Sequence, residues 1–371
     1  MNMPNKNILG LILLCSCFIC ITPITTYSGT LATSDFIDKL EMNGDLRIRY
    51  EWKEKDVDNE DPVDRWRNRF RLGMKFNNPE EGYKIAAGLT TGPVDATSTD
   101  STYSETTYFE TGDIRLDYAY AEHKMDCFKF IGGQQKNPWE TTWIFWDSDV
   151  RPVGLTGQYN MDAFFLTVGG YDVRYVEKDV AYMYAAQAGM KMEMITAALA
   201  YYGYTRVDEI IDVAAWENMD DDYGYDIIDL YVATDIKADP VKIKPYAQVF
   251  YNMGAEGEEG QSVLNKTPDG VSLDPEEENL GWVVGCEAKI DKFSCSLDYT
   301  QVGADSVIPG LKDATFGSEL NSTDVEGFKI GLGYAITKNV GIAATAFLYQ
   351  AKERDIDQDP QTYQFDLNYK F

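Results

Sequence analysis

Arginines recur at every second position in two neighbouring stretches of this sequence. Arg47 and Arg49 form the first pair, and a longer Arg-x-Arg row follows at Arg65, Arg67, Arg69 and Arg71, with Arg115 further along the chain. A spacing of two places all of these side chains on one face of a β-strand. A row of permanently charged guanidinium groups can bind or steer anions and can set up a transverse electric field.

A second interpretation of the same residues is purely structural. Asp45, Glu51, Asp117 and acidic loop residues lie close enough in sequence to pair with the arginines and fill a polar interior. The two interpretations do not exclude each other, and the sequence leaves both open.

The strands that must carry these arginines have one apolar and one polar face. The last ten residues put Tyr363, Phe365, Leu367, Tyr369 and Phe371 on one side and only polar residues on the other. The same alternation places the arginines opposite Leu46, Ile48, Tyr50 and Trp52. Lipid-facing arginines would cost about 2–4 kcal/mol each near the middle of a bilayer, so the arginine face is expected to line a watery interior.

This pattern continues along the chain and predicts an all-β fold: a transmembrane, antiparallel, up-and-down β-barrel of about sixteen strands. Short periplasmic turns should alternate with long extracellular loops, and the first and last of these loops should be neighbours once the barrel closes. Aromatic residues fall at both ends of the strands, as in the two interfacial girdles of such barrels. A secreted β-sandwich or propeller is the soluble alternative.

The loop 136–154 carries Glu140, Asp147 and Asp149 among three tryptophans and Phe145. So aromatic a loop is expected to fold into the barrel mouth, where it would narrow the lumen and bring its carboxylates towards the arginines. The alternative is that it packs over the rim or against a neighbouring subunit. Together with the seven arginines, these three acids are the predicted pore-lining and constriction residues.

Composition alone would suggest an acidic soluble protein, with a formal net charge of −28 over 371 residues and a mean hydropathy of −0.35. Residues 1–32 read as a secretory signal peptide with cleavage between 28 and 32, followed by the barrel over residues 33–371. Three cysteines lie in this segment, and the odd number that remains, Cys127, Cys286 and Cys295, implies no disulfide framework.

Catalysis and metal binding have little support in the sequence. The only histidine, His123, is expected at a short turn with no nucleophile nearby. The acidic loops 56–61, 220–222 and 355–359 could coordinate calcium or bridge lipopolysaccharide through divalent ions. The last of them has Pro360 where a calcium loop needs glycine and has no room for a distal glutamate, so a solvated loop is the preferred interpretation. No cofactor is implied, and the strong negative charge argues against nucleic acid as a partner.

Several motifs in the first third of the mature chain resemble the putative-porin family of Gram-negative outer membranes. They are Gly44-Asp-Leu-Arg-Ile-Arg-Tyr-Glu51, the Arg-x-Arg-x-Arg run, and Gly133-Gln-Gln-Lys-Asn-Pro138 followed by Trp146-Asp-Ser-Asp149 and Pro152-Val-Gly154. The resemblance implies a monomer barrel that forms a diffusion channel in the outer membrane, with no assigned solute.

The sequence therefore predicts an outer-membrane porin for passive diffusion of ions and small hydrophilic solutes. The alternatives are a barrel that acts as an adhesin or structural anchor through its acidic loops, and an outer-membrane hydrolase. Expected partners are membrane lipid, lipopolysaccharide and the barrel assembly machinery, which would read the terminal Phe371; a homotrimer is left open.

Overall fold

The computed structural model describes residues 33–57, 60–93, 97–103, 111–176, 179–210, 222–264, 272–320, 322–354, 356 and 358–371. The expected signal peptide, 1–32, lies outside these residues, as do parts of the acidic loops. The chain divides into two compact units, Met1–Lys39 and Leu40–Phe371, of which the first contains the helix α2 (Thr33–Asp38). Among the described residues, no helix is long and apolar enough to cross a membrane.

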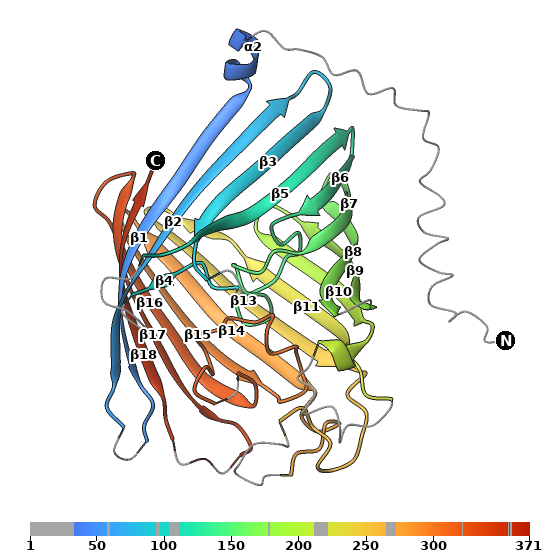
Figure 1. The fold of residues 1–371 in the computed structure, drawn as a ribbon, viewed down its shortest axis with the longest axis vertical. Coiled ribbons are helices and arrows are strands. Elements are labelled where there is room, and N and C mark those ends of the chain that lie inside the picture. The colour runs from blue at the N-terminus through green and yellow to red at the C-terminus, as the bar shows by residue number, and fades with distance from the viewer. Residues whose placement is uncertain are drawn as a thin grey trace, which may run out of the picture. The chain divides into compact units, whose positions relative to one another are not determined.

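The second unit is a single antiparallel sheet that closes on itself (Figure 1). Its elements are β1 (Leu40–Glu54), β2 (Val63–Asn78), β3 (Tyr83–Thr91), β4 (Ser101–Thr102), β5 (Ile114–Met125), β6 (Phe128–Gln134), β7 (Val153–Met161), β8 (Phe164–Val176), β9 (Asp179–Lys191), β10 (Ile195–Tyr204), the 3₁₀ turn η1 (Val207–Glu209), β11 (Asp226–Thr234), β12 (Ile236–Ala238), β13 (Val241–Asn252), β14 (Leu280–Ile290), β15 (Phe293–Val302), β16 (Val325–Ala335), β17 (Val340–Ala351) and β18 (Gln361–Lys370).

Sixteen of these segments act as barrel strands. β12 continues β11 along the same partner, β13, and the two-residue β4 pairs with β2 from within a loop. β1 closes the barrel by pairing with β2 on one side and with β18 on the other, in register from Asp45 opposite Lys370 to Glu54 opposite Gln361. The predicted closed, antiparallel barrel of about sixteen strands is confirmed.

Short turns and longer loops alternate along the chain, as predicted. The longer loops gather at the lower end of Figure 1. One hairpin departs from the pattern, because Val176 pairs with Asp179 and the connection between β8 and β9 is therefore short. The first and last loops are neighbours, since the backbone N–H of Asp359 donates to the Asp56 carboxylate at 2.9 Å.

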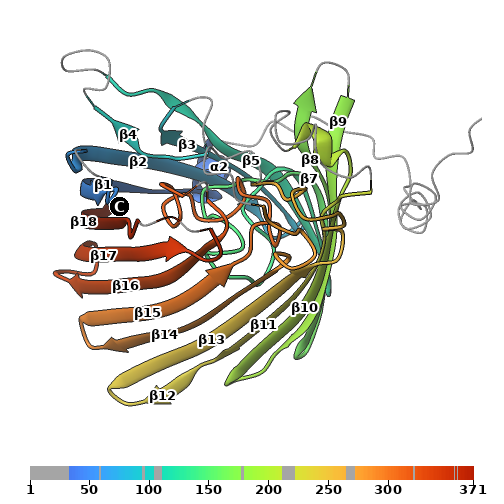
Figure 2. The ribbon, with the colours of Figure 1, turned by 90° about the horizontal axis from the view of Figure 1, so that it is seen from below.

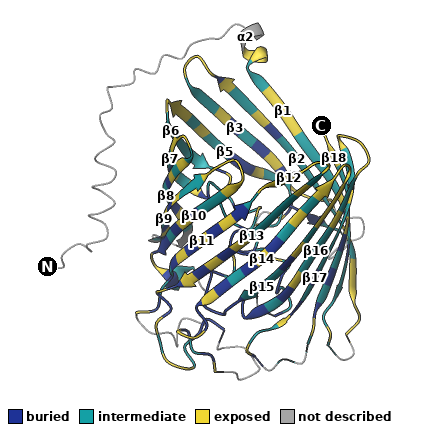
Figure 3. Ribbon diagram, turned by 180° about the vertical axis from the view of Figure 1, so that it is seen from behind, coloured by how far each residue is buried: buried dark blue, intermediate teal, exposed yellow. Residues whose placement is uncertain are grey.

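The outward face of the barrel is apolar. Figure 3 shows exposed and more buried residues alternating along the strands, and the exposed ones include Trp66, Leu155 and Phe365. Aromatic contacts lie at both strand ends: Trp52 with Tyr363 near the loops, and Phe293 with Tyr334 near the turns. A continuous belt of exposed apolar side chains is typical of a surface covered by lipid.

Solvent labelling checks this assignment of faces. In a variant that lacks Cys127, Cys286 and Cys295, we expect single cysteines at Arg69 and Asn368 to react with a membrane-impermeant thiol reagent. Cysteines at Leu46 and Phe365 should be protected, because a strand exposes successive side chains to opposite faces. The reverse labelling pattern would mean that the barrel presents its charged face to lipid, which would refute the assignment.

The end of the chain is fixed at the seam of the barrel. Gly44 and Phe371 exchange two backbone hydrogen bonds, of 2.9 and 3.1 Å, and the Phe371 ring stacks on Phe70 with centroids 6.1 Å apart. A Cβ atom at position 44 would lie 2.3 Å from the Phe371 ring. Glycine at position 44 therefore leaves the space that the terminal ring occupies.

Candidate functional site

The arginine row lies on the inner face of β1 and β2. The strand register sets Arg47 directly opposite Arg69 and Arg49 directly opposite Arg67. Like charges directly opposite each other in a sheet destabilise it, so this arrangement requires compensating groups nearby.

Carboxylates supply that compensation for every arginine of the row. The pairs, with the shortest N–O distance where one is given, are Arg47 with Asp100 (2.6 Å), Arg49 with Asp366 (2.6 Å), Arg65 with Glu51 (2.7 Å), Arg67 with Glu51 (3.3 Å), Arg69 with Asp45 (2.7 Å) and Arg71 with Asp149. Glu51, which is 2% exposed, also accepts a hydrogen bond of 2.9 Å from Gln364. The row is thus a network in which each guanidinium group lies next to a carboxylate.

Asp100 is the carboxylate shared by three of the six arginines in this network. The short strand β4 holds the adjacent residues against β2, and the Asp100 carboxylate lies within 4 Å of Arg47, Arg49 and Arg67. Burial alone would raise the pKa of Asp100, but these three guanidinium groups lower it below its ordinary value. Asp100 therefore stays ionised at neutral and mildly acidic pH.

Arg115 and Asp117, on β5, lie at the edge of this network. The Arg115 guanidinium donates to the backbone carbonyl oxygens of Thr97 (2.9 Å) and Ser98 (2.7 Å), and so supports the segment that carries Asp100. A bulge at Asp117 interrupts the alternation, so that Asp117 and Tyr118 are both buried, and Asp117 pairs with Arg151 at 2.9 Å. Neither residue lines the cavity between the arginine row and the infolded loops.

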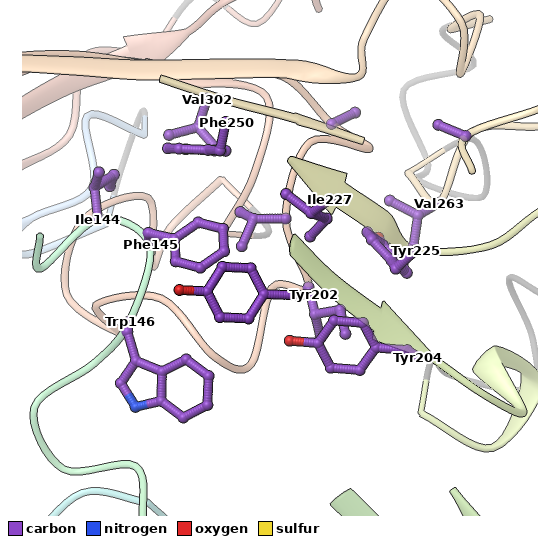
Figure 4. Close-up of a cluster of buried hydrophobic side chains, with 14 of the residues drawn as sticks. Ile144, Phe145, Trp146, Tyr202, Tyr204, Tyr225, Ile227, Phe250, Val263 and Val302 are labelled. Carbon is purple, nitrogen blue, oxygen red and sulfur yellow. The ribbon is translucent and has the colours of Figure 1, made fainter. Parts of the chain in front are cut away.

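The aromatic loop between β6 and β7 folds into the lumen, as its composition predicts. Trp139, Ile144, Phe145 and Trp146 are all at least 95% buried. The Phe145 ring lies 5.0 Å from that of Tyr202 and 5.2 Å from that of Phe250, between β10 and β13 (Figure 4). The loop is therefore packed against the inner wall on the side opposite the arginines.

A second infolded loop, 303–324, was not predicted from the sequence. The N–H of Asp147 donates to the Leu311 carbonyl at 2.6 Å, and the N–H of Asp313 donates to the Trp143 carbonyl at 3.1 Å. Phe316 packs edge-on against Trp143 and tilts onto Tyr349. Figure 2, which looks along the barrel, shows these loop segments inside the ring of strands.

The three acids predicted from the aromatic loop have different surroundings. Asp149 reaches the arginine row, where it contacts Arg71 and accepts a hydrogen bond of 2.7 Å from Thr99. Burial would raise the pKa of Asp149, but Arg71 and Thr99 lower it. Glu140 instead contacts Lys191 on β9, away from the arginines.

Asp147 faces the arginine row without an arginine partner among the described residues. Its carboxylate accepts backbone hydrogen bonds from Asp149 at 2.7 Å and Ala314 at 3.3 Å. Burial, together with the nearby charges of Asp313 and Asp149, raises the pKa of Asp147 to about 6.

A cavity of about 340 Å³ separates the arginine wall from the infolded loops. Its charged lining consists of Arg47, Arg49, Lys53, Arg65, Arg67, Arg69 and Lys329 on the strands with Glu51, and of Asp100, Asp147, Asp149 and Asp313 on the loops. Lys329, on β16, lies 4.0 Å from the centre of the Trp143 ring and has no ion pair within the described ranges. The gap therefore has a mainly cationic wall facing a mainly anionic one.

Sequence reasoning missed Asp366, Asp313 and Lys329. The alternation in the last strand does place Asp366 on the inner face, so pairing of that strand with the first would have indicated its contact with Arg49. No comparable signal marks Asp313, because it lies in an irregular loop. His123 lies within β5 rather than in the turn expected from the sequence, because β5 continues to Met125.

In the part of the chain that the structure describes, no group of three or more histidine, cysteine or acidic residues is placed to hold a metal ion.

Comparisons with known proteins agree with this geometry. In structure, the chain is similar to a triple mutant of the Rhodopseudomonas blastica porin, with a TM-score of 0.54, 11% identity, and coverage of 90% of this chain and 100% of that one. It is also similar to OprB of Pseudomonas putida at low pH, with a TM-score of 0.55, 11% identity, and coverage of 91% and 95%. At this identity the likeness shows the fold alone. No curated protein sequence matches the chain.

The sequence itself carries a family match that includes the arginines of β2, Arg115 on β5 and the aromatic loop, but not Arg47 or Arg49 on β1. Residues 56–229 match the model of the family described as "Putative porin", and this confirms the family resemblance inferred from the sequence motifs.

Proposed function

We propose that this protein is a non-enzymatic outer-membrane channel through which ions and small hydrophilic solutes diffuse passively along the arginine wall. The observation that supports it best is the cavity between β1, β2, β16, β17 and β18 and the infolded loops. The porin-like fold and the family match support an outer-membrane location.

Apolar side chains fill the other side of the lumen at the level of the infolded loops. Side chains of both infolded loops form one apolar cluster with the inner faces of β8 to β11 and β13 to β17, including Tyr202, Phe250 and Phe347. Such close-packed side chains leave no room for water, so a permeating solute would pass along the arginine side.

Charge at the gap favours anions. Seven cationic and five anionic side chains line it, which leaves an excess of positive charge. In planar bilayers with a salt gradient, we expect a reversal potential whose sign shows that anions are more permeable than cations. A correctly assembled barrel without measurable conductance would contradict the channel proposal and would favour the alternative of an adhesin or structural anchor.

Acidification should strengthen this anion preference. Asp147, with a pKa of about 6, is ionised at pH 7.5 and mostly protonated at pH 5, whereas the pKa values of Asp100 and Asp149 are lowered and both remain charged. We expect the anion-to-cation permeability ratio to rise roughly twofold over this range. Reversal potentials measured at each pH test this, and Asp147→Asn should abolish the change.

Assembly is proposed to depend on Phe371, read by the barrel assembly machinery, with lipid and lipopolysaccharide around the finished barrel. Deleting Phe371 removes both seam hydrogen bonds and the stack on Phe70. We expect the truncated protein to lose most of its heat-modifiable, folded form in membrane fractions. Unchanged gel mobility and yield would contradict this role. Crosslinking in membranes would show whether barrels associate as trimers.

A further inference from the structure

A second, smaller cavity lies on the inner wall near the short turns. Its volume is about 230 Å³, and inward-facing residues of β5, β6 and β7 line it together with the first residues of the infolded loop. Tyr120, Lys129 and Ile131 come from the strands, and Gln135 and Lys136 from the loop.

Two lysines of this cavity lack an anionic partner. Within the described ranges, neither Lys129 nor Lys136 forms an ion pair or a hydrogen bond; the Lys136 ammonium instead lies 5.2 Å from the centre of the Tyr118 ring. By contrast, Lys84 on the neighbouring strand is paired with Glu122 at 2.8 Å. Neither ammonium group is paired directly, although the Glu122 carboxylate acts electrostatically on Lys129 and the Asp117 carboxylate on Lys136.

Gln135 adds a donor that is also unsatisfied. Its side chain is 1% exposed, and its oxygen accepts a hydrogen bond of 2.9 Å from Thr156, but its amide nitrogen has no hydrogen-bond partner. An unpaired buried donor is unfavourable, because it has lost its hydrogen bonds to water without gaining another. Gln135 lines the cavity, so its amide nitrogen is the candidate donor to an acceptor bound there.

We propose that this cavity binds the carboxylate of a small organic acid, with Lys129, Lys136 and the Gln135 amide nitrogen as donors. Ile131 and Pro138 provide apolar surface for the rest of such a molecule. Glu122 also lines the cavity and fixes a negative charge there, so a monoanion is favoured over a dianion such as hydrogen phosphate.

The site extends the cationic surface of the channel. Lys136 interacts electrostatically with Arg151 and with Arg71, the last member of the arginine row. A carboxylate that leaves the gap at the arginine wall would therefore meet positive charge again before it reaches the end of the barrel with the short turns. This route rests on the proposed channel function, but binding itself does not, because the cavity exists whether or not the barrel conducts.

Binding can be measured on the purified, folded barrel in detergent by saturation-transfer NMR, with butyrate as the probe. We expect saturable butyrate binding and little signal from the neutral isostere 1-butanol. In competition experiments, inorganic phosphate should displace butyrate less effectively than propionate does. Binding of butanol equal to that of butyrate would overturn the proposal. Stronger competition by phosphate than by propionate would overturn its assignment to organic monoanions.

Substitutions locate the site. Lys129→Gln combined with Lys136→Gln should weaken butyrate binding at least about tenfold, because charge-assisted hydrogen bonds are lost. Lys129→Arg with Lys136→Arg, which keeps both charges, should retain most of it. Lys191→Gln is the matched control, since Lys191 already pairs with Glu140 outside the cavity.

Unchanged butyrate affinity in the double glutamine variant would refute the site. Bilayer recordings on the same protein keep the two proposals apart. Conductance without butyrate binding refutes only the second cavity as a site, whereas butyrate binding without conductance refutes only the channel.

Discussion

Replacing Arg67 and Arg69 together with glutamate is expected to convert the channel from anion-selective to cation-selective. The exchange inverts the charge excess at the gap. It also removes the arginine that pairs with Asp45 and one of the arginines that neutralise Glu51 and Asp100. The shift in reversal potential should therefore be larger than the shift caused by removing two unpaired cations. The measurement is the reversal potential in a salt gradient, which should change sign.

Salt and the opposite substitution provide further checks on this result. The Debye length falls from about 10 Å at 0.1 M to 3 Å at 1 M, so the shift should shrink in concentrated salt. Asp147→Asn with Asp149→Asn should move selectivity the other way, towards anions.

A matched control separates local charge from total charge. Lys292→Glu with Lys338→Glu makes the same change in net charge, but both residues are exposed in short turns away from the gap. This control should keep the anion preference. If the arginine variant assembles correctly and its selectivity is unchanged, the row serves only to fill a polar interior.

Loosening the aromatic loop is expected to raise single-channel conductance several-fold. Phe145 and Trp139 anchor the loop against Tyr202, with ring centroids 5.0 and 5.6 Å away. Truncating each to alanine costs about 3–5 kcal/mol of packing energy, which is comparable to the total stability of many loops. The double variant should therefore populate states in which the loop leaves the lumen.

Larger solutes should then pass as well, which liposome-swelling assays with sugars of increasing size can measure. Phe293→Ala removes an equally large ring from the outward face, where 59% of the side chain is exposed, and should leave conductance unchanged. Equal conductance in the loop variant and the native protein would mean that the apolar cluster does not restrict the channel.

The period-two pattern was sufficient to predict the barrel, because lipid and water impose opposite demands on successive side chains. The faces of β1, β2 and β18 follow from this rule alone. The infolding of the aromatic loop followed from its composition, because so many aromatic side chains need an apolar environment.

The partners within the gap could not be predicted in the same way. Asp100 lies 53 residues from Arg47, and Asp366 lies 317 residues from Arg49, so neither contact leaves a local pattern. The bulge at Asp117, which buries Tyr118 as well, is an irregularity of backbone hydrogen bonding that alternation does not encode. Glu140 was expected near the arginines, but its place is set by the path of the loop towards Lys191.

The seam between β1 and β18 also constrains the order in which the barrel can fold. Its contacts join the two ends of the barrel sequence, so none of them can form until the last residues have been synthesised. Contacts of such large sequence separation make folding slow, and the open edges of the unfinished sheet are prone to aggregate. The unclosed chain must therefore be kept soluble until closure, and the bond between Arg49 and Asp366 should be among the last to form.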